Sequence, residues 1–253
     1  MSLETFLSEP ESAERTLLLA NRTEPEPFRV MLEKLVDEQD IAFEEVTDEE
    51  FEDDTVVLVE DGAVVATSPL SALQDAILMV NSDLFITGTR KLEATDVPAV
   101  IDGLADHPFT LRGYPESNSE KLLLILISRH IERLAYEQGS GWLRSSFQYL
   151  SRLEDERGTR EVYEKLAATD VDVHLYGRPD WTQSPGFPVT VHGGYKEDFR
   201  NSWFVVHRPA EDEPEHSGAA LVAIEVDPGV WDGFWTYDDE LVEDIAEYIR
   251  RYL

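Results

Sequence analysis

The clearest hydrophobic pattern in the chain lies between residues 119 and 138. Apolar side chains recur there in alternating steps of three and four residues, the spacing of one face of an α-helix, and further leucines widen that face. The recurring positions are Leu124, Ile127, Ile131 and Leu134, and the widening ones are Leu122, Leu123 and Leu126. Ser117 and Glu120 have capping-box spacing, and Gly139 is the expected stop. Such a helix belongs between layers of a fold or at a contact between subunits.

The residues before this helix predict a small α/β unit. Four short apolar runs have the length of strands, and Asp61-Gly62 predicts a hairpin between the last two. Ser68 is expected to cap a helix that has Pro69 in its first position. The strand candidates are residues 15–20, 41–46, 55–59 and 63–67, and the helix candidates are residues 25–36, 68–80 and 98–104.

After the long helix, the pattern predicts two more helices and then a run of strands. The helix candidates are residues 143–150 and 159–167, and the strand candidates are residues 171–176, 189–192, 203–207, 219–226 and 234–236. A last helix over residues 238–252 has an acidic first turn and ends with Arg250 and Arg251, as the helix dipole favours.

Together these elements predict an α/β (α+β) protein of two parts. Residues 1–112 are expected to form an acidic N-terminal α/β domain with a small sheet and two or three helices. Residues 113–253 are expected to form a mostly antiparallel sheet flanked by helices, comparable by analogy with GAF-like ligand sensors. The long helix would join the two parts, and its apolar seam suggests a homodimer contact.

Charge is distributed unevenly along the chain. The formal net charge is −32, yet residues 112–165 hold nine basic and nine acidic side chains. The net charge of the whole chain argues against nucleic-acid partners, because a strongly acidic protein repels a phosphate backbone. The excess negative charges repel one another, and high ionic strength screens this repulsion. We therefore expect a halophilic protein from a salt-rich archaeal cytoplasm.

Several classes of protein are excluded by composition. Cysteine is absent, which rules out disulfides, thiolate metal sites and cysteine nucleophiles. The longest uninterrupted apolar run has six residues, too few for membrane insertion, and the first residues do not resemble a signal peptide. We therefore expect a cytoplasmic protein.

Several segments, taken in order along the chain, match the motifs of a known family. The helix at 124–135 contains Ser128-Arg129-His130-Ile131-Glu132, Phe147-Gln148 follows, and a strand ends in Tyr176-Gly177. Further matching segments are residues 139–144, 163–167, 179–181, 221–225 and 231–235. In this order they resemble the DICT domain, a sensory module found with diguanylate cyclases and two-component proteins. The acidic composition and the leading segment resemble stand-alone, transducer-like haloarchaeal members. The resemblance covers roughly residues 115–253. It implies that the chain senses a signal, and the remaining residues hold no pattern of an output domain.

Candidate ligand-binding residues come from two groups of side chains. Aromatic residues gather near the end of the chain, where they form either a core between sheet and helices or an aromatic-lined pocket on the sheet. Arginines of the central segment either bind an anionic ligand or pair with nearby carboxylates. The candidates are Arg129, Arg133, Arg144, Tyr176, Trp181, Trp203 and Trp235.

No catalytic or metal-binding motif is recognisable. His174, His192 and His207 lie on or beside strand candidates, but their spacing fits no metal motif, and a place in the core or at its rim is favoured. No Gly-x-Ser-x-Gly elbow and no P-loop occur. We therefore assign no catalytic residue, no metal and no particular cofactor.

The sequence favours a non-catalytic cytoplasmic sensory or regulatory protein. It would bind a small ligand or a signalling partner and act through a separate output protein. Two alternatives stay open: an adaptor that binds proteins without a small ligand, and an enzyme with an unrecognised carboxylate-based site.

Overall fold

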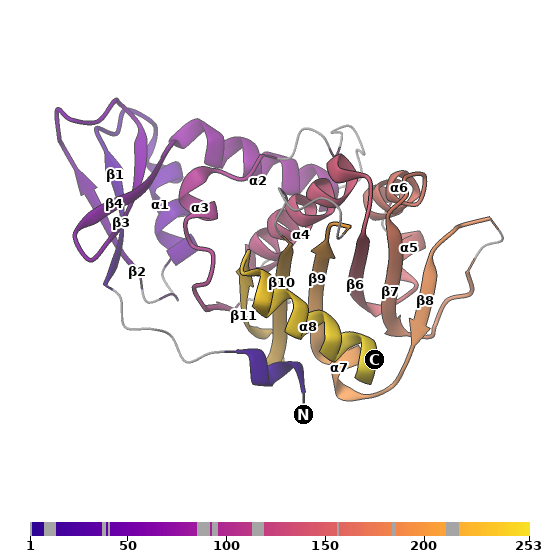
Figure 1. The fold of residues 1–253 in the computed structure, drawn as a ribbon. Helices are drawn as coiled ribbons and strands as arrows, with labels where there is room; N and C mark the ends of the chain where they lie inside the picture. The colour runs from indigo at the N-terminus through magenta and orange to yellow at the C-terminus, as the bar shows by residue number, and fades with distance from the viewer. Residues whose placement is uncertain are drawn as a thin grey trace.

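The computed structural model contains two β-sheets with helices packed around them, an α/β fold (Figure 1). It describes residues 2–7, 14–36, 39, 41–84, 92, 96–112, 119–155, 157–183, 186–210 and 218–253. The expected capping residue Ser117 lies outside these ranges. No helix in the described ranges is both long and apolar enough to cross a membrane.

The first sheet has four strands in the order β2-β1-β3-β4. Its strands are β1 (Arg15–Ala20), β2 (Ile41–Val46), β3 (Thr55–Glu60) and β4 (Ala63–Pro69). β1 and β2 are parallel and joined by α1 (Glu26–Val36), while β3 and β4 form the predicted hairpin. At the hairpin turn, Asp61 and Gly62 both adopt positive φ, the conformation that an Asp-Gly turn supplies. The helices α2 (Leu70–Leu84) and α3 (Ala99–Asp102) follow.

The second sheet has seven strands in the order β5-β11-β10-β9-β6-β7-β8. Its strands are β5 (Phe109–Arg112), β6 (Trp142–Tyr149), β7 (Asp172–Arg178), β8 (Thr190–Gly193), β9 (Ser202–Arg208), β10 (Ala219–Asp227) and β11 (Val230–Thr236). Neighbouring strands are antiparallel from β5 through to β6, and only β6-β7 and β7-β8 pair in parallel. The sheet is therefore mostly antiparallel, as predicted.

Helices cover both faces of the second sheet. Figure 1 shows α8 (Asp239–Tyr252) on one face and α4 (Ser119–Gln138) on the other, each in contact with β9 and β10. The short helices α5 (Arg152–Asp155) and α6 (Arg157–Leu166) follow β6, and α7 (Glu197–Asn201) precedes β9. The N-terminal 3-10 helix η1 (Leu3–Phe6) packs beside α8, where Leu3 is fully buried.

The long central helix is the core element that its pattern predicted. Leu124, Ile127 and Ile131 are each at most 1% exposed because they pack onto the second sheet. α4 also contacts α2, and so it connects the two sheets. Gly139 ends it with φ +69°, a left-handed conformation that glycine adopts without strain. Because the chain itself buries this seam, the seam offers little surface to a second copy, and a homodimer stays a prediction.

Three local predictions need correction. Residues 142–149 form the strand β6, although Leu143, Phe147 and Leu150 have helical spacing. β6 lies inside the sheet and buries side chains on both faces, so the alternation that marks a strand is missing. Ser68 and Pro69 end β4, and Ser68 Oγ accepts a hydrogen bond from the backbone N–H of Val100. β5 and α7 were not predicted.

Candidate functional site

A pocket of about 500 Å³ lies at one end of the strands of the seven-stranded sheet, on the face that α4 covers. The parallel strands β6 and β7 end there. β9 begins there because it pairs antiparallel with β6, and β11 begins there because β10, which is antiparallel to both β9 and β11, ends there. Leu124 of α4 contributes to the wall. Ends of parallel strands favour ligand sites because loops can place functional groups around a rigid edge.

Three arginines from separate elements line this pocket, which we call the arginine pocket. Arg152 starts α5, Arg178 ends β7 and Arg200 lies near the end of α7. Arg178 Nη1 donates to Tyr149 Oη at 2.9 Å, and its guanidinium lies over the Tyr149 ring, 4.8 Å from the centroid. In the described part of the chain, none of the three arginines forms an ion pair with a carboxylate.

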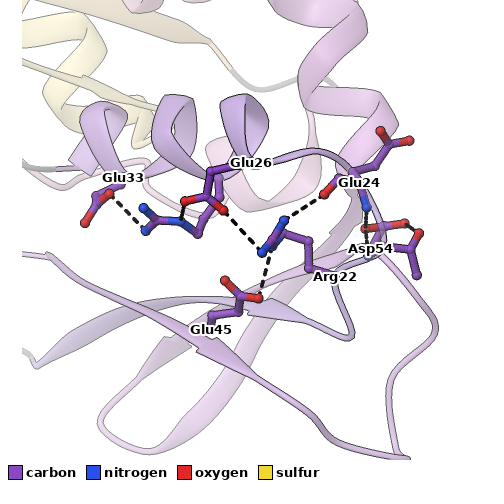
Figure 2. Close-up of polar contacts among 8 residues, drawn as sticks. Arg22, Glu24, Glu26, Glu33, Glu45 and Asp54 are labelled. Atoms are coloured by element: carbon purple, nitrogen blue, oxygen red, sulfur yellow. Dashed lines mark hydrogen bonds and ion pairs between the residues drawn. The ribbon is translucent and has the colours of Figure 1, made fainter.

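Two arginines beside the N-terminal sheet provide a contrast. Figure 2 shows Arg22 held between Glu26 and Glu45, with nitrogen–oxygen distances of 3.2 and 3.0 Å. Arg29 likewise pairs with Glu26 at 2.6 Å and with Glu33 at 3.0 Å. In a chain with 53 acidic side chains, such neutralisation is the expected fate of an arginine. The arginine pocket departs from it by gathering positive charge.

The other side of the pocket is aromatic and polar. The rings of Trp203 and Trp231 stand nearly perpendicular, at 89° with centroids 6.4 Å apart. Trp203 Nε1–H donates to Ser128 Oγ of α4 at 2.9 Å, which fixes the indole against the helix. Glu225 Oε1 accepts the backbone N–H of Gly229 at 3.0 Å. The remaining polar lining residues are Gln148 and Asn201.

Of the seven predicted binding residues, only Trp203 lines the arginine pocket. Arg133 pairs with Asp96 at 2.5 Å and Glu137 at 2.7 Å on the surface. Trp181 packs edge-on against Phe187. Trp235 is 2% exposed and lies beside a small apolar cavity where α1, α3 and α4 meet. The structure therefore distributes the predicted residues over several regions.

Arg129 belongs to a buried network between α4 and α6. Its guanidinium pairs with Glu132 at 2.5 Å and donates to Thr159 Oγ1 at 3.0 Å. Tyr163 Oη donates to the other oxygen of Glu132 at 2.7 Å. Burial and the negative charge of Glu132 raise the pKa of Tyr163, so the phenol keeps its proton and remains a donor. This network joins two helices and leaves Arg129 engaged.

Arg144 and Tyr176 meet on the opposite face of the sheet. Arg144 Nη1 donates to Tyr176 Oη at 2.5 Å, and the guanidinium lies 5.2 Å from the Trp142 ring centroid. The Tyr176 ring stacks on His192 with centroids 4.3 Å apart. His192 in turn is 2.9 Å from His174, measured between ring nitrogens. Arg144, Tyr176 and His192 thus form an aromatic and cationic strip across β6, β7 and β8.

The three strand histidines are only partly brought together. His174 and His192 are neighbours, and burial, followed by the charges of His174 and Arg144, lowers the pKa of His192. His207 lies on the other face, between Gln138 and the carbonyl of Trp142. Among the described residues, no group of three or more His, Asp or Glu side chains is arranged to hold a metal ion.

The pocket arginines escaped prediction for a definable reason. Interpreting residues 143–150 as a helix hid the end of β6, so Gln148, Tyr149 and Arg152 did not appear as residues that follow a strand. A parallel partner for that strand would have directed attention to Arg178 at the end of β7. Arg200 lies in the unpredicted helix α7, so no pattern pointed to it.

The structure places an open pocket at the strand ends of an α/β fold, and a fold of this class does not by itself define an activity. Residues 100–223 match the family model described as DICT, the sensory domain in diguanylate cyclases and two-component systems. The DICT resemblance that the motifs indicated is therefore confirmed for this segment, which begins and ends before the expected residues 115–253. The match includes most pocket residues, while Glu225 and Trp231 lie beyond it.

Other comparisons add little. No significant match was found among curated protein sequences. One solved structure, the polyphosphate kinase from Porphyromonas gingivalis, aligns with a TM-score of 0.37 and 12% identity. The alignment spans 61% of this chain and 25% of the kinase chain.

Proposed function

We propose that this protein is a non-catalytic sensor that binds a small anionic ligand in the arginine pocket and signals to a separate partner protein. One observation carries the proposal: Arg152, Arg178 and Arg200 converge on a single pocket with no carboxylate partner in the described part of the chain. The match of residues 100–223 to a sensory family supports the signalling role.

The pocket is lined by more positive than negative charge. Three guanidinium groups that face one pocket repel one another, and Glu225 supplies a single opposing charge. An anion that bridges two of them would relieve this repulsion through charge-assisted, often bidentate hydrogen bonds. Phosphate and carboxylate groups match the guanidinium fork, so the expected ligand carries at least one of them.

A route from the pocket to the rest of the protein runs through α4. Leu124 lines the pocket, and Ser128, one turn later, accepts the Trp203 indole hydrogen bond. α4 then contacts α2 beside the N-terminal sheet. A ligand that binds differently to two positions of Trp203 would shift the position of α4, which is the energetic requirement for signalling.

The proposal can be tested by binding pyrophosphate to the purified full-length protein in a fixed concentration of potassium chloride. We expect saturable binding by titration calorimetry that falls at least tenfold in Arg178→Gln and in Arg152→Gln. Arg29→Gln is the matched control, because it removes the same charge from an arginine already paired with two glutamates. We expect it to bind pyrophosphate as the wild type does.

Four results would contradict the proposal. If pyrophosphate fails to bind, the pocket does not bind this anion. If Arg29→Gln weakens binding as much as Arg178→Gln does, only the net charge matters and the pocket is not the site. Release of inorganic phosphate during the titration would show turnover and favour the enzyme alternative. Stabilisation by a copurified protein alone, without any anion effect, would favour the adaptor.

A further inference from the structure

The order of strands gives the arginine pocket two chemically different ends. Along the sheet, Arg178 lies on β7, Trp203 on β9, Glu225 on β10 and Trp231 on β11. Neighbouring strands are roughly 4.8 Å apart, so β7 and β11 are separated by about 19 Å. Arg152 and Arg178 therefore place positive charge at the end formed by β6 and β7, and aromatic rings and one carboxylate form the other end, with Arg200 directly before β9 between them.

From this arrangement we infer that the anionic ligand of the proposed function is a nucleoside phosphate. Its phosphate binds the arginines at the ends of β6 and β7, and its base lies against Trp203. This inference rests on the proposed function, because it names the chemical class of the ligand for the same pocket.

The aromatic end suits a flat ring. Trp203 is partly exposed, whereas Trp231 is 7% exposed and stands perpendicular behind it. The hydrogen bond from Trp203 to Ser128 holds the indole in place, so little side-chain entropy is lost when a ring stacks on it. A base stacked on an aromatic side chain gains about 1–3 kcal/mol, whatever the identity of the base.

Glu225 accounts for the hydrogen-bonding part of the ligand. A carboxylate is an acceptor with about four lone-pair sites, and among the described residues Glu225 accepts only one bond, from the N–H of Gly229 to Oε1. A ligand that reaches Glu225 must therefore present N–H or O–H donors. The amino group of a base and the hydroxyls of ribose both meet this need, whereas a simple aromatic acid whose carboxylate binds the arginines would present only C–H groups there.

The volume of the pocket is consistent with a ligand of this size. About 500 Å³ falls inside the range of roughly 300–1,000 Å³ that is usual for small-molecule sites. Gln148 and Asn201 add amide groups that both donate and accept, the side-chain type that reads base edges.

The test compares ligands that share a phosphate but differ in the base. AMP, GMP, CMP and UMP are titrated against the full-length protein beside ribose 5-phosphate and pyrophosphate, by calorimetry and by tryptophan fluorescence. We expect at least one nucleotide to bind at least tenfold more tightly than ribose 5-phosphate and to quench fluorescence. That quenching should be lost in Trp203→Phe, and Glu225→Gln should weaken nucleotide binding about tenfold while pyrophosphate affinity is not reduced.

The outcomes separate this inference from the proposed function. If ribose 5-phosphate binds as tightly as every nucleotide, the anion pocket stands and the nucleotide inference is wrong. If nucleotides bind better but their quenching persists in Trp203→Phe and Glu225→Gln leaves their affinity unchanged, the base does not lie where we place it. If neither pyrophosphate nor any nucleotide binds, the proposed function itself fails.

Discussion

The buried network between α4 and α6 allows a quantitative prediction about stability. Glu132 is 2% exposed and Arg129 is 7% exposed, and both belong to the network that includes Tyr163. In Arg129→Met, the carboxylate of Glu132 would remain in a region with little water, without its guanidinium partner. Removal of one member of a buried pair costs about 3–5 kcal/mol, because the other charge is left uncompensated. Glu132→Leu is expected to cost a similar amount.

The double variant Arg129→Met/Glu132→Leu is expected to be more stable than either single variant. Both charges are then gone, and the main remaining cost is the Tyr163 hydroxyl, which loses its acceptor. A buried donor without a partner costs about 1–3 kcal/mol. The two single losses together would give about 6–10 kcal/mol if they were additive, so we expect a coupling energy of at least about 3 kcal/mol.

Urea unfolding followed by tryptophan fluorescence, at one fixed potassium chloride concentration, measures these free energies. Arg160→Met is the control. The Arg160–Glu164 pair lies on α6, the helix that carries Tyr163, but its side chains are 42% and 50% exposed. We expect that variant to lose no more than about 1 kcal/mol. If Arg129→Met costs as little as this control, or if the two single losses simply add, the network is not a buried, mutually dependent unit.

Two further predictions concern histidine protonation and a strained turn. Burial lowers the pKa of His207 to about 4, so the stability that its neutral form contributes is complete above pH 6.5 and is lost as the pH falls toward 4. Between pH 7 and pH 5 this loss is about 2 kcal/mol, and in His207→Gln unfolding curves at the two pH values should differ by correspondingly less. Gly141→Ala should cost more than Gly62→Ala in the same assay, although both glycines have φ near +80°, because only at Gly141 would the new Cβ meet a backbone atom, the Arg208 carbonyl oxygen, at 2.1 Å. Equal losses at the two glycines would show that the contact is relieved by a small shift.

The sequence was most informative where local pattern and final environment agree. The strand 41–46 and the helix 119–138 were predicted with the bounds that the structure has. In the closing helix, the Asp238 side chain accepts the N–H of Leu241, as an N-cap residue does. These elements have one buried side or a strong end signal, so hydrophobic spacing alone identifies them.

Prediction failed where burial on two sides removed the pattern. β6 lies between β9 and β7 and buries four consecutive side chains, from Leu143 to Ser146. Its period therefore carried no information, and the accidental spacing of Leu143, Phe147 and Leu150 favoured a helix. The division at residue 112 stays a prediction, although β5, which ends there, pairs with β11 of the second sheet.

The candidate site could not be predicted from a single sequence, for a topological reason. Arg152, Arg178 and Arg200 are separated by more than twenty residues each, and only the pairing of β6 with β7 and of β6 with β9 brings them to one edge. The neutral charge balance of residues 112–165 did indicate the region, since Arg152 lies within it. Most of its other described arginines pair with local carboxylates, and charge counting alone pointed to those arginines and not to Arg178 or Arg200.

Whether such a pocket can drive a signal depends on how much binding energy it holds. To move a two-state equilibrium from 1:99 to 99:1, a ligand must favour one state by about 5.5 kcal/mol. A hydrogen bond to a charged group contributes about 1.5–3 kcal/mol, so contacts to two of the three arginines supply about 3–6 kcal/mol if they form in one state only. Stacking on Trp203 adds about 1–3 kcal/mol in the same state. Because Trp203 is tied to α4 through Ser128, the part of the ligand that stacks is also the part best placed to move the helix. A ligand that held only the arginines would bind, yet it would have little effect on α4, which is why the nucleotide comparison also bears on signalling.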